Sequence, residues 1–112
     1  MTLRLGEVVL IRMQFHQAPG SKVRPALVLL DGGDDDFVAA PITSQARLSE
    51  HDCTIEDWRV AGLNVASSVR IHKLTVLAKA EVMRRLGLLS DADHESLIAV
   101  LCRAFCPRTS GK

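Results

Sequence analysis

SKVRPALVLLDGG, residues 21–33, is the stretch that decides the fold. A polar run ends in Arg24, and Pro25 is followed at once by five apolar residues. Proline has no backbone donor and is tolerated at the first residue of a strand. The stretch therefore predicts a buried strand that begins at Pro25, with Arg24 directly before its first residue. The Asp-Gly pair that follows predicts a turn into a second, antiparallel strand over 37–40, stopped by Pro41.

The rest of the chain reads as a compact β-rich domain. Its apolar runs are short and either β-branched or alternating, as strands require. They predict a small curled sheet or barrel. The remaining predicted strands are 7–11, 53–58, 67–72 and 74–78, and residues 14–23, with their Pro-Gly pair, are predicted as a long loop.

The last element is predicted to be an α-helix packed against the sheet. Ser90 is its N-cap, and Asp93, three residues later, resembles the second member of a capping box. Pro107 ends the helix, and residues 107–112 are expected to be a frayed tail. A single apolar stripe is predicted from the spacing of Leu97, Ile98, Leu101, Ala104 and Phe105.

Length and composition limit the classes of protein. A chain of 112 residues suits one domain, 1–112, with its core at about 6–105. The net charge of +1 argues against a surface that binds nucleic acid everywhere, so an anionic partner must meet a local patch. No apolar run is long enough for a membrane span. The cysteines lack metal-type spacing against the histidines, and reduced thiols in the cytoplasm are the simplest explanation.

Five segments stand out by their order and spacing: LGEVVLI (5–11), SKVRPALVLL (21–30), PITSQ (41–45), AGLNVASSVRIHKL (61–74) and LGLLSDADHESLIAVL (86–101). Together they give the chain a resemblance to the PemK/MazF family of toxin endoribonucleases. The resemblance spans residues 6–105. It implies a mainly β, SH3-like barrel (the PemK/MazF/CcdB-like type) with a C-terminal helix, and a cytoplasmic homodimer. It also implies the toxin of a type II toxin–antitoxin system, which cleaves single-stranded RNA without metal or cofactor and is inhibited by a cognate antitoxin.

The resemblance also marks four catalytic candidates. Cleavage through the 2′-hydroxyl of RNA needs a base, an acid and positive charge on the phosphate. Arg24 matches the family's active-site arginine, and the resemblance places Thr43 beside it. Arg70 matches the arginine of an Arg-x-Asp pair that supplies acid and base in one branch of the family, and His72 replaces the aspartate. The two stand two apart on an extended segment and should share a face; which group is acid and which is base stays open.

Four further residues are predicted to contact RNA: His16, Lys22, Ser44 and Gln45. Plainer interpretations remain open for the catalytic candidates. Arg24 could be the solvated end of a strand, Thr43 could close a Ser/Thr turn, and Arg70 and His72 could lie on a solvated strand face. Two other functions also remain open: a non-catalytic barrel that inhibits a protein target, as CcdB-type toxins do, and an inactive relative.

Overall fold

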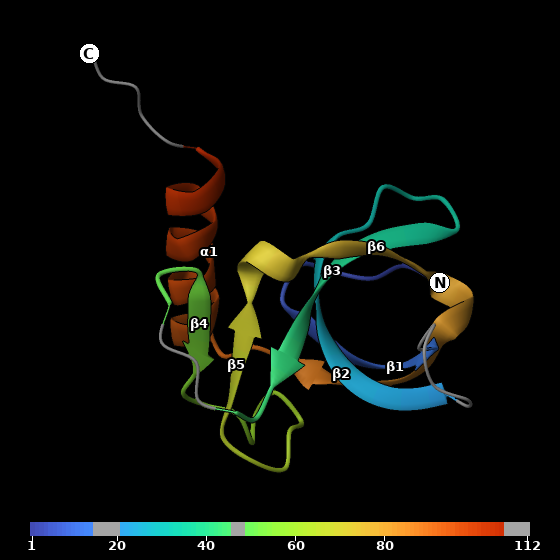
Figure 1. Cartoon of the computed structure of the whole chain (residues 1–112), viewed down its shortest axis with the longest axis horizontal. Coiled ribbons are helices and arrows are strands. Elements are labelled where there is room, and N and C mark those ends of the chain that lie inside the picture. Colours follow the sequence, from blue (N-terminus) through green and yellow to red (C-terminus); the bar gives the residue numbers. More distant parts are fainter. Residues whose placement is uncertain (15–20, 46–48, 107–112) are drawn as a thin grey trace.

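The computed structural model describes residues 1–14, 21–45 and 49–106 (Figure 1). Within them the chain is mainly β, with one α-helix near its C-terminal end, which confirms the predicted class. The elements are β1 (Glu7–Gln14), β2 (Ser21–Leu30), β3 (Asp36–Thr43), β4 (Asp52–Ile55), β5 (Ser67–Arg70), η1 (Ile71–Lys73), β6 (Thr75–Ala78), η2 (Lys79–Glu81), β7 (Val82–Leu88) and α1 (Asp91–Phe105).

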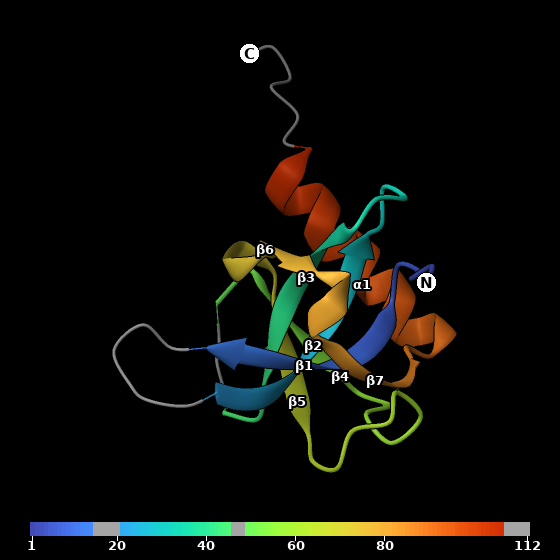
Figure 2. The ribbon, with the colours of Figure 1, turned by 90° about the vertical axis from the view of Figure 1, so that its right-hand side faces the viewer.

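All strand pairs are antiparallel, in the order β4-β5-β3-β2-β1-β7. β3 is the strand that joins two parts of the sheet. It pairs with β6 over residues 36–39 and with β5 at Ile42 and Thr43. The strands curl around the β1–β3 region, as the prediction of a small curled sheet or barrel requires, but the described strands leave the sheet open. β5 and β4 extend away from the curled part toward α1 (Figures 1 and 2).

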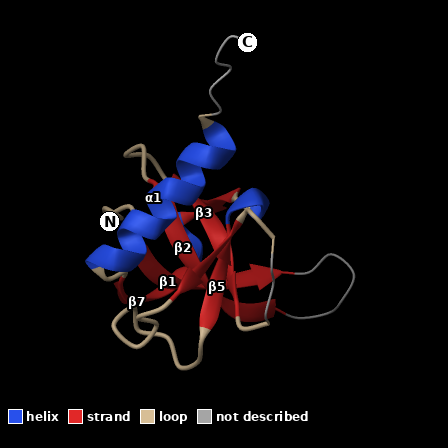
Figure 3. Cartoon of the chain, turned by 90° about the vertical axis from the view of Figure 1, so that its left-hand side faces the viewer, coloured by secondary structure: helices blue, strands red, loops and turns tan. Residues whose placement is uncertain are grey.

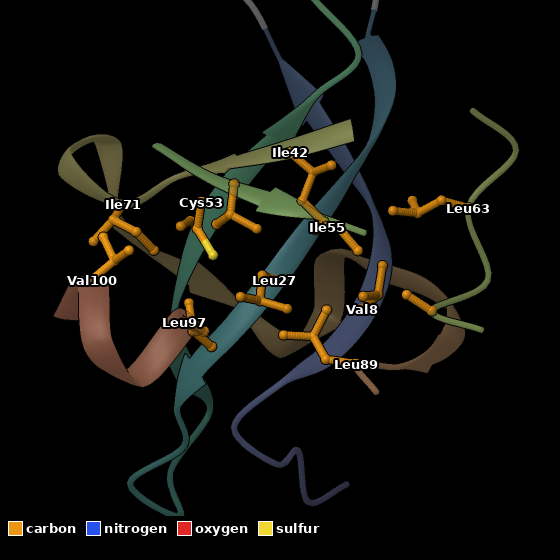
Figure 4. Packing of buried hydrophobic residues seen from close by; sticks show 13 residues of the cluster. Val8, Leu27, Ile42, Cys53, Ile55, Leu63, Ile71, Leu89, Leu97 and Val100 are labelled. Atoms are coloured by element: carbon orange, nitrogen blue, oxygen red, sulfur yellow. The ribbon is translucent and has the colours of Figure 1, made fainter. Parts of the chain in front are cut away.

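The sheet buries a different core on each face because successive side chains of a strand point in opposite directions. Val8 and Leu27, paired across β1 and β2, belong to the core that α1 covers (Figures 3 and 4). Val9 and Ala26, the next pair, belong to a second core with Phe37. Among the described residues, no helix is long and apolar enough to cross a membrane.

Helix α1 begins as predicted, but only part of the predicted apolar stripe faces the sheet. The Ser90 hydroxyl accepts a hydrogen bond from the Asp93 N–H, as an N-cap should. Leu97 and Val100 are buried against the sheet, whereas Ile98 and Phe105, predicted in the apolar stripe, are exposed. The prediction was wrong for these two because the buried face runs through Asp93, Leu97 and Val100, which includes a polar residue.

Asp93 leaves the predicted capping box for a tertiary contact. Its side chain is buried, and its two carboxylate oxygens accept hydrogen bonds from the backbone N–H groups of Glu56 and Asp57, at 3.0 and 2.8 Å. A carboxylate here also lies at the positive end of the helix dipole. Asp93 therefore ties the start of α1 to the turn that follows β4.

Two prolines lie inside strands, which corrects the predicted boundaries. β2 begins at Ser21 instead of Pro25, so residues 14 and 21–23 of the predicted loop belong to strands. β3 continues through Pro41 to Thr43. Both positions suit a residue without an N–H. β2 pairs with β3 only from Ala26 onward, and Pro41 lies in the gap between the β6 and β5 pairings of β3.

The second half of the chain contains one strand that was not predicted. β7 is an edge strand against β1, and two register shifts interrupt the pairing. Its sequence, VMRRLGL, has two adjacent arginines and no regular alternation of apolar and polar residues, so the sequence pattern did not indicate a strand.

The three cysteines are free thiols, Cys53 buried and the other two exposed.

Candidate functional site

A polar surface covers the face of β3, β5 and β4 opposite the core that α1 covers. Thr43 pairs with Ser68, and Arg70 pairs with Asp52. Because register and alternation fix the face, these four side chains lie together, while their neighbours Ile42, Val69 and Cys53 point into the core. Thr43 and Arg70 are diagonal neighbours across β3 and β5, a relation that sets Cα atoms about 7–8 Å apart.

Arg24 reaches this surface from β2. It is exposed and lies two residues before Ala26, hence on the face away from α1. A hollow of about 90 Å³ is lined by Arg24, by Pro41 of β3 and by Lys73 of η1. The structure therefore brings Arg24 to the same hollow as the turn that follows Arg70.

Thr43 closes the Ser/Thr turn that the plainer interpretation describes. Its hydroxyl oxygen accepts a hydrogen bond from the Gln45 N–H at 3.1 Å. A hydroxyl has two acceptor lone pairs and one donor proton, so this bond leaves the proton to be donated. The turn and a phosphate contact are therefore compatible for Thr43. Gln45 itself is exposed.

Ser44 takes the opposite direction from Thr43. It lines a larger cleft of about 380 Å³, together with Arg24, Asn64 and Arg84. Arg84 comes from β7, and Asn64 from the segment before β5, so sequence reasoning had no means of placing either beside Ser44. Arg24 thus lines both hollows.

Arg70 is held by a buried carboxylate. Its Nε lies 3.4 Å from Asp52 Oδ1; the Asp52 side chain is 3% exposed and that of Arg70 is 22% exposed. Burial acts to raise the pKa of Asp52, but hydrogen bonds from the Ser49 N–H and hydroxyl, together with Arg70, outweigh it and lower the pKa below its usual value. Asp52 is therefore a stable anion that fixes the direction of Arg70.

His72 does not lie on an extended segment, which corrects the predicted geometry. β5 ends at Arg70, and His72 is exposed within the 3₁₀ turn η1. The two side chains nevertheless meet: Arg70 Nη2 lies 3.4 Å from His72 Nε2. A guanidinium has only donors, so Nε2 of His72 accepts in this contact when the ring proton is on Nδ1.

His51 joins this group although the sequence analysis did not select it. Its ring centre lies 5.7 Å from that of His72. Its backbone carbonyl accepts a hydrogen bond from the Ile71 N–H at 3.0 Å, which links the start of β4 to η1. Only the β4–β5 pairing, which the sequence does not reveal, could have selected it among the histidines.

Of the two other residues predicted to contact RNA, Lys22 lies on a strand and His16 lies outside the described residues. Lys22 is exposed on β2, two residues before Arg24 and on the same face, instead of in a loop. Lys73 was missed, and with it the face carries four cationic side chains: Lys22, Arg24, Arg70 and Lys73. In the described part of the chain, no three His, Cys, Asp or Glu side chains gather as metal ligands would.

Solved structures resemble the fold over almost the whole chain. Mycobacterium tuberculosis toxin MazF-mt6 superposes with a TM-score of 0.69, at 22% identity, over 88% of this chain and 96% of its own. An endoribonuclease in complex with its cognate antitoxin, from a mycobacterial species, gives 0.71 at 17% identity, over 96% and 98%. The MazE–MazF structure from Deinococcus radiodurans (Form-II) gives 0.73 at 18% identity, over 92% and 95%.

Sequence comparisons complete the assignment. Curated proteins give no match to the chain. The family model of the PemK-like, MazF-like toxin of type II toxin–antitoxin systems matches residues 4–105, most of the chain. The match includes both halves of the polar surface, from Arg24 on β2 to His72 in η1. The chain therefore belongs to the PemK-like, MazF-like family of type II toxin–antitoxin toxins.

Proposed function

We propose that this toxin cleaves single-stranded RNA by transesterification and that the polar surface around Thr43 and Arg70 is its active site. The observation that carries the proposal is the convergence of two arginines, Arg24 and Arg70, on the face that also holds Thr43 and His72. Membership of the toxin family and the endoribonuclease named among the similar structures support the same function.

The chemistry asked of this site is modest because RNA carries its own nucleophile. The 2′-hydroxyl attacks the adjacent phosphorus, so the protein has to remove a proton and stabilise the charge that develops on the phosphate. Arg24 and Arg70 supply planar donor groups that bind phosphate oxygens in pairs. The Thr43 proton left free by its turn would be donated to a third oxygen.

His72 would act as the base. Its Nε2 lone pair already accepts from Arg70, so the base and a phosphate-binding group lie side by side before RNA binds. When Arg70 moves onto a phosphate oxygen, the lone pair becomes available to the neighbouring 2′-hydroxyl. Histidine suits this role because its side chain normally titrates near neutral pH.

The partner we propose is an antitoxin protein encoded with the toxin. Two of the similar structures are of toxins with an antitoxin, one of them described as cognate. An antitoxin segment that covers the four cationic side chains would exclude RNA from the same surface. The homodimer implied by the family resemblance stays a prediction, testable by light scattering of the purified chain.

The experiment is a cleavage assay on a long single-stranded RNA in EDTA, comparing the wild type, Arg24→Ala and Arg103→Ala. Arg103 is the matched control because it is exposed on α1, on the other side of the sheet. Removing one charge-stabilising group from such a site slows cleavage by about 10²–10³-fold. We expect that loss for Arg24→Ala only, with 2′,3′-cyclic phosphate ends in the wild-type products.

Other results would redirect the proposal. Intact RNA with the wild type, across several sequences, would leave a toxin that acts by binding a protein target or an inactive relative. Equal cutting by wild type and Arg24→Ala would keep RNA cleavage but remove Arg24 from the site.

A further inference from the structure

We propose that His51 is the general acid of the reaction, protonating the departing 5′-oxygen while His72 removes the proton of the 2′-hydroxyl. The inference rests on the proposed function and adds the one role that it leaves open. Transesterification needs two proton transfers on opposite sides of the phosphorus, and two positioned imidazoles can perform both. The chain places two histidines, far apart in sequence, beside one phosphate-binding arginine.

The distance between the rings fits a shared phosphate. The ring centres of His51 and His72 are 5.7 Å apart and the planes are tilted by 48°, so the rings do not stack face to face. Each imidazole needs to come within about 2.6–3.2 Å of the oxygen it serves. Both rings can therefore reach oxygens of the same phosphodiester, with Arg70 next to His72 to hold it.

The backbone around His51 is firmly held, as an acid that must meet one oxygen requires. The His51 N–H donates to the Ser49 hydroxyl at 3.2 Å, and the His51 carbonyl accepts from the Ile71 N–H at 3.0 Å. Asp52 closes the same turn, because its N–H donates to the Ser49 carbonyl and its Oδ2 accepts from the Ser49 N–H. The half-buried His51 side chain thus projects from a turn fixed on both sides.

The charged groups near the two rings include an ion pair and two exposed side chains next to them in the chain, Glu50 before His51 and Lys73 after His72. Asp52 forms its ion pair with Arg70, and the same guanidinium lies beside His72, with Nη2 3.4 Å from Nε2. No described carboxylate is bonded to either imidazole, which leaves both rings able to exchange protons with a substrate. The contact with Arg70 suits His72, with its proton on Nδ1, as the proton acceptor, and His51 takes the donor role.

The step balances without any further reactant. His72 takes the proton of the 2′-hydroxyl as the O2′–P bond forms, and His51 gives its proton to O5′ as the P–O5′ bond breaks. The products are a 2′,3′-cyclic phosphate and a 5′-hydroxyl. No electron is transferred, and exchange with solvent returns each histidine to its starting state.

The test compares two RNAs that differ in one atom. In the second RNA, sulfur replaces the 5′-oxygen at the cleaved bond. A thiol has a pKa of about 8.5, far below that of an alcohol, so the thiolate departs without an acid. His51→Ala and His51→Gln are assayed on both RNAs, and His72→Ala is the variant that lacks the base. His94→Ala is the control, because His94 lies near the start of α1, away from the polar surface.

We expect His51→Ala and His51→Gln to slow cleavage of ordinary RNA by about 10²–10⁴-fold, the usual contribution of a positioned acid. On the sulfur-containing RNA both should cut within a few-fold of the wild type. His72→Ala should be slow on both RNAs, and His94→Ala on neither. Rescue by sulfur separates an acid from a residue that merely maintains the fold.

Two results would overturn the acid role while leaving the proposed function intact. The first is normal cleavage of ordinary RNA by both His51 variants. The second is an equal loss on the two RNAs, which would make His51 a positioning or structural residue. If the wild type cuts neither RNA, the proposed function and the acid role fail together.

Discussion

Replacing Asp93 by asparagine tests how firmly the start of α1 is tied to the turn after β4. The side chain is 1% exposed, and its two oxygens accept from the N–H groups of Glu56 and Asp57. Asparagine keeps the shape and one acceptor oxygen, but it turns an NH₂ group toward the second N–H. One charge-assisted bond is lost, and a buried donor faces another donor.

The expected loss follows from those contacts. A hydrogen bond to a charged group contributes about 1.5–3 kcal/mol to stability. The negative charge in the first helical turn contributes about 0.3–1 kcal/mol more through the helix dipole. The free energy of unfolding should therefore fall by about 2–4 kcal/mol, which moves the midpoint of urea unfolding down by about 1–3 M.

Trp58, the only tryptophan, gives the fluorescence signal, and far-ultraviolet circular dichroism provides an independent one. Asp91→Asn is the matched control, since Asp91 is exposed in the same first turn and should lose only the dipole contribution. If Asp93→Asn lowers the unfolding free energy no more than Asp91→Asn does, the tertiary role assigned to this carboxylate is refuted.

Three further predictions concern stability. Gly62→Ala should cost more than about 2 kcal/mol of unfolding free energy, because φ is +86° and the new Cβ would lie 2.2 Å from the Leu86 carbonyl oxygen. Leu97→Ala should cost about 2–5 kcal/mol, since the side chain is fully buried. Asp31→Asn should destabilise at neutral pH, because the Leu3 N–H above all, with the other donors to the carboxylate, lowers the pKa of Asp31. A lowered pKa stabilises the fold above the usual value of 3.8, so this difference should shrink as the pH falls below it.

Urea unfolding measures all three, each beside a control. Gly33→Ala shares the positive φ, +94°, but its Cβ meets open space, so it isolates the clash at the first site. Ile98→Ala removes a partly exposed side chain of α1, and Asp34→Asn removes an exposed carboxylate of the same turn. A variant that loses no more stability than its control would contradict the corresponding prediction. A constant difference between Asp31→Asn and the wild type from pH 7 to acid would do so for the third.

Local signals predicted much of the fold. The apolar run after Pro25 and the Asp-Gly turn gave the β2–β3 hairpin, and Ser90 marked the start of α1 correctly. What failed depended on partners distant in the chain. Whether Pro41 ends a strand depends on where β6 and β5 pair with β3. Whether the Asp93 side chain caps the helix or binds elsewhere depends on a turn about 36 residues away.

The candidate site likewise contains residues that the sequence predicted and residues that it did not. Residue type and family resemblance selected Arg24, Thr43 and Arg70, and the strand register then explains why they share a surface. His51 could not be selected, because only the pairing of β4 with β5 brings it to the η1 turn. The sequence shows which side chains have suitable chemistry, whereas the register of the strands decides which of them lie next to each other.

The division of β1, β2 and β3 between two cores determines where the chain can change length. A single inserted residue in one of these strands would send every later side chain of that strand to the opposite face. An insertion before Ala26, for example, would put Ala26 in the space of Leu27 and leave a cavity in the core that α1 covers. Length variation within the family should therefore concentrate between strands, as in the exposed turn at 32–35, while the strands keep a fixed number of residues.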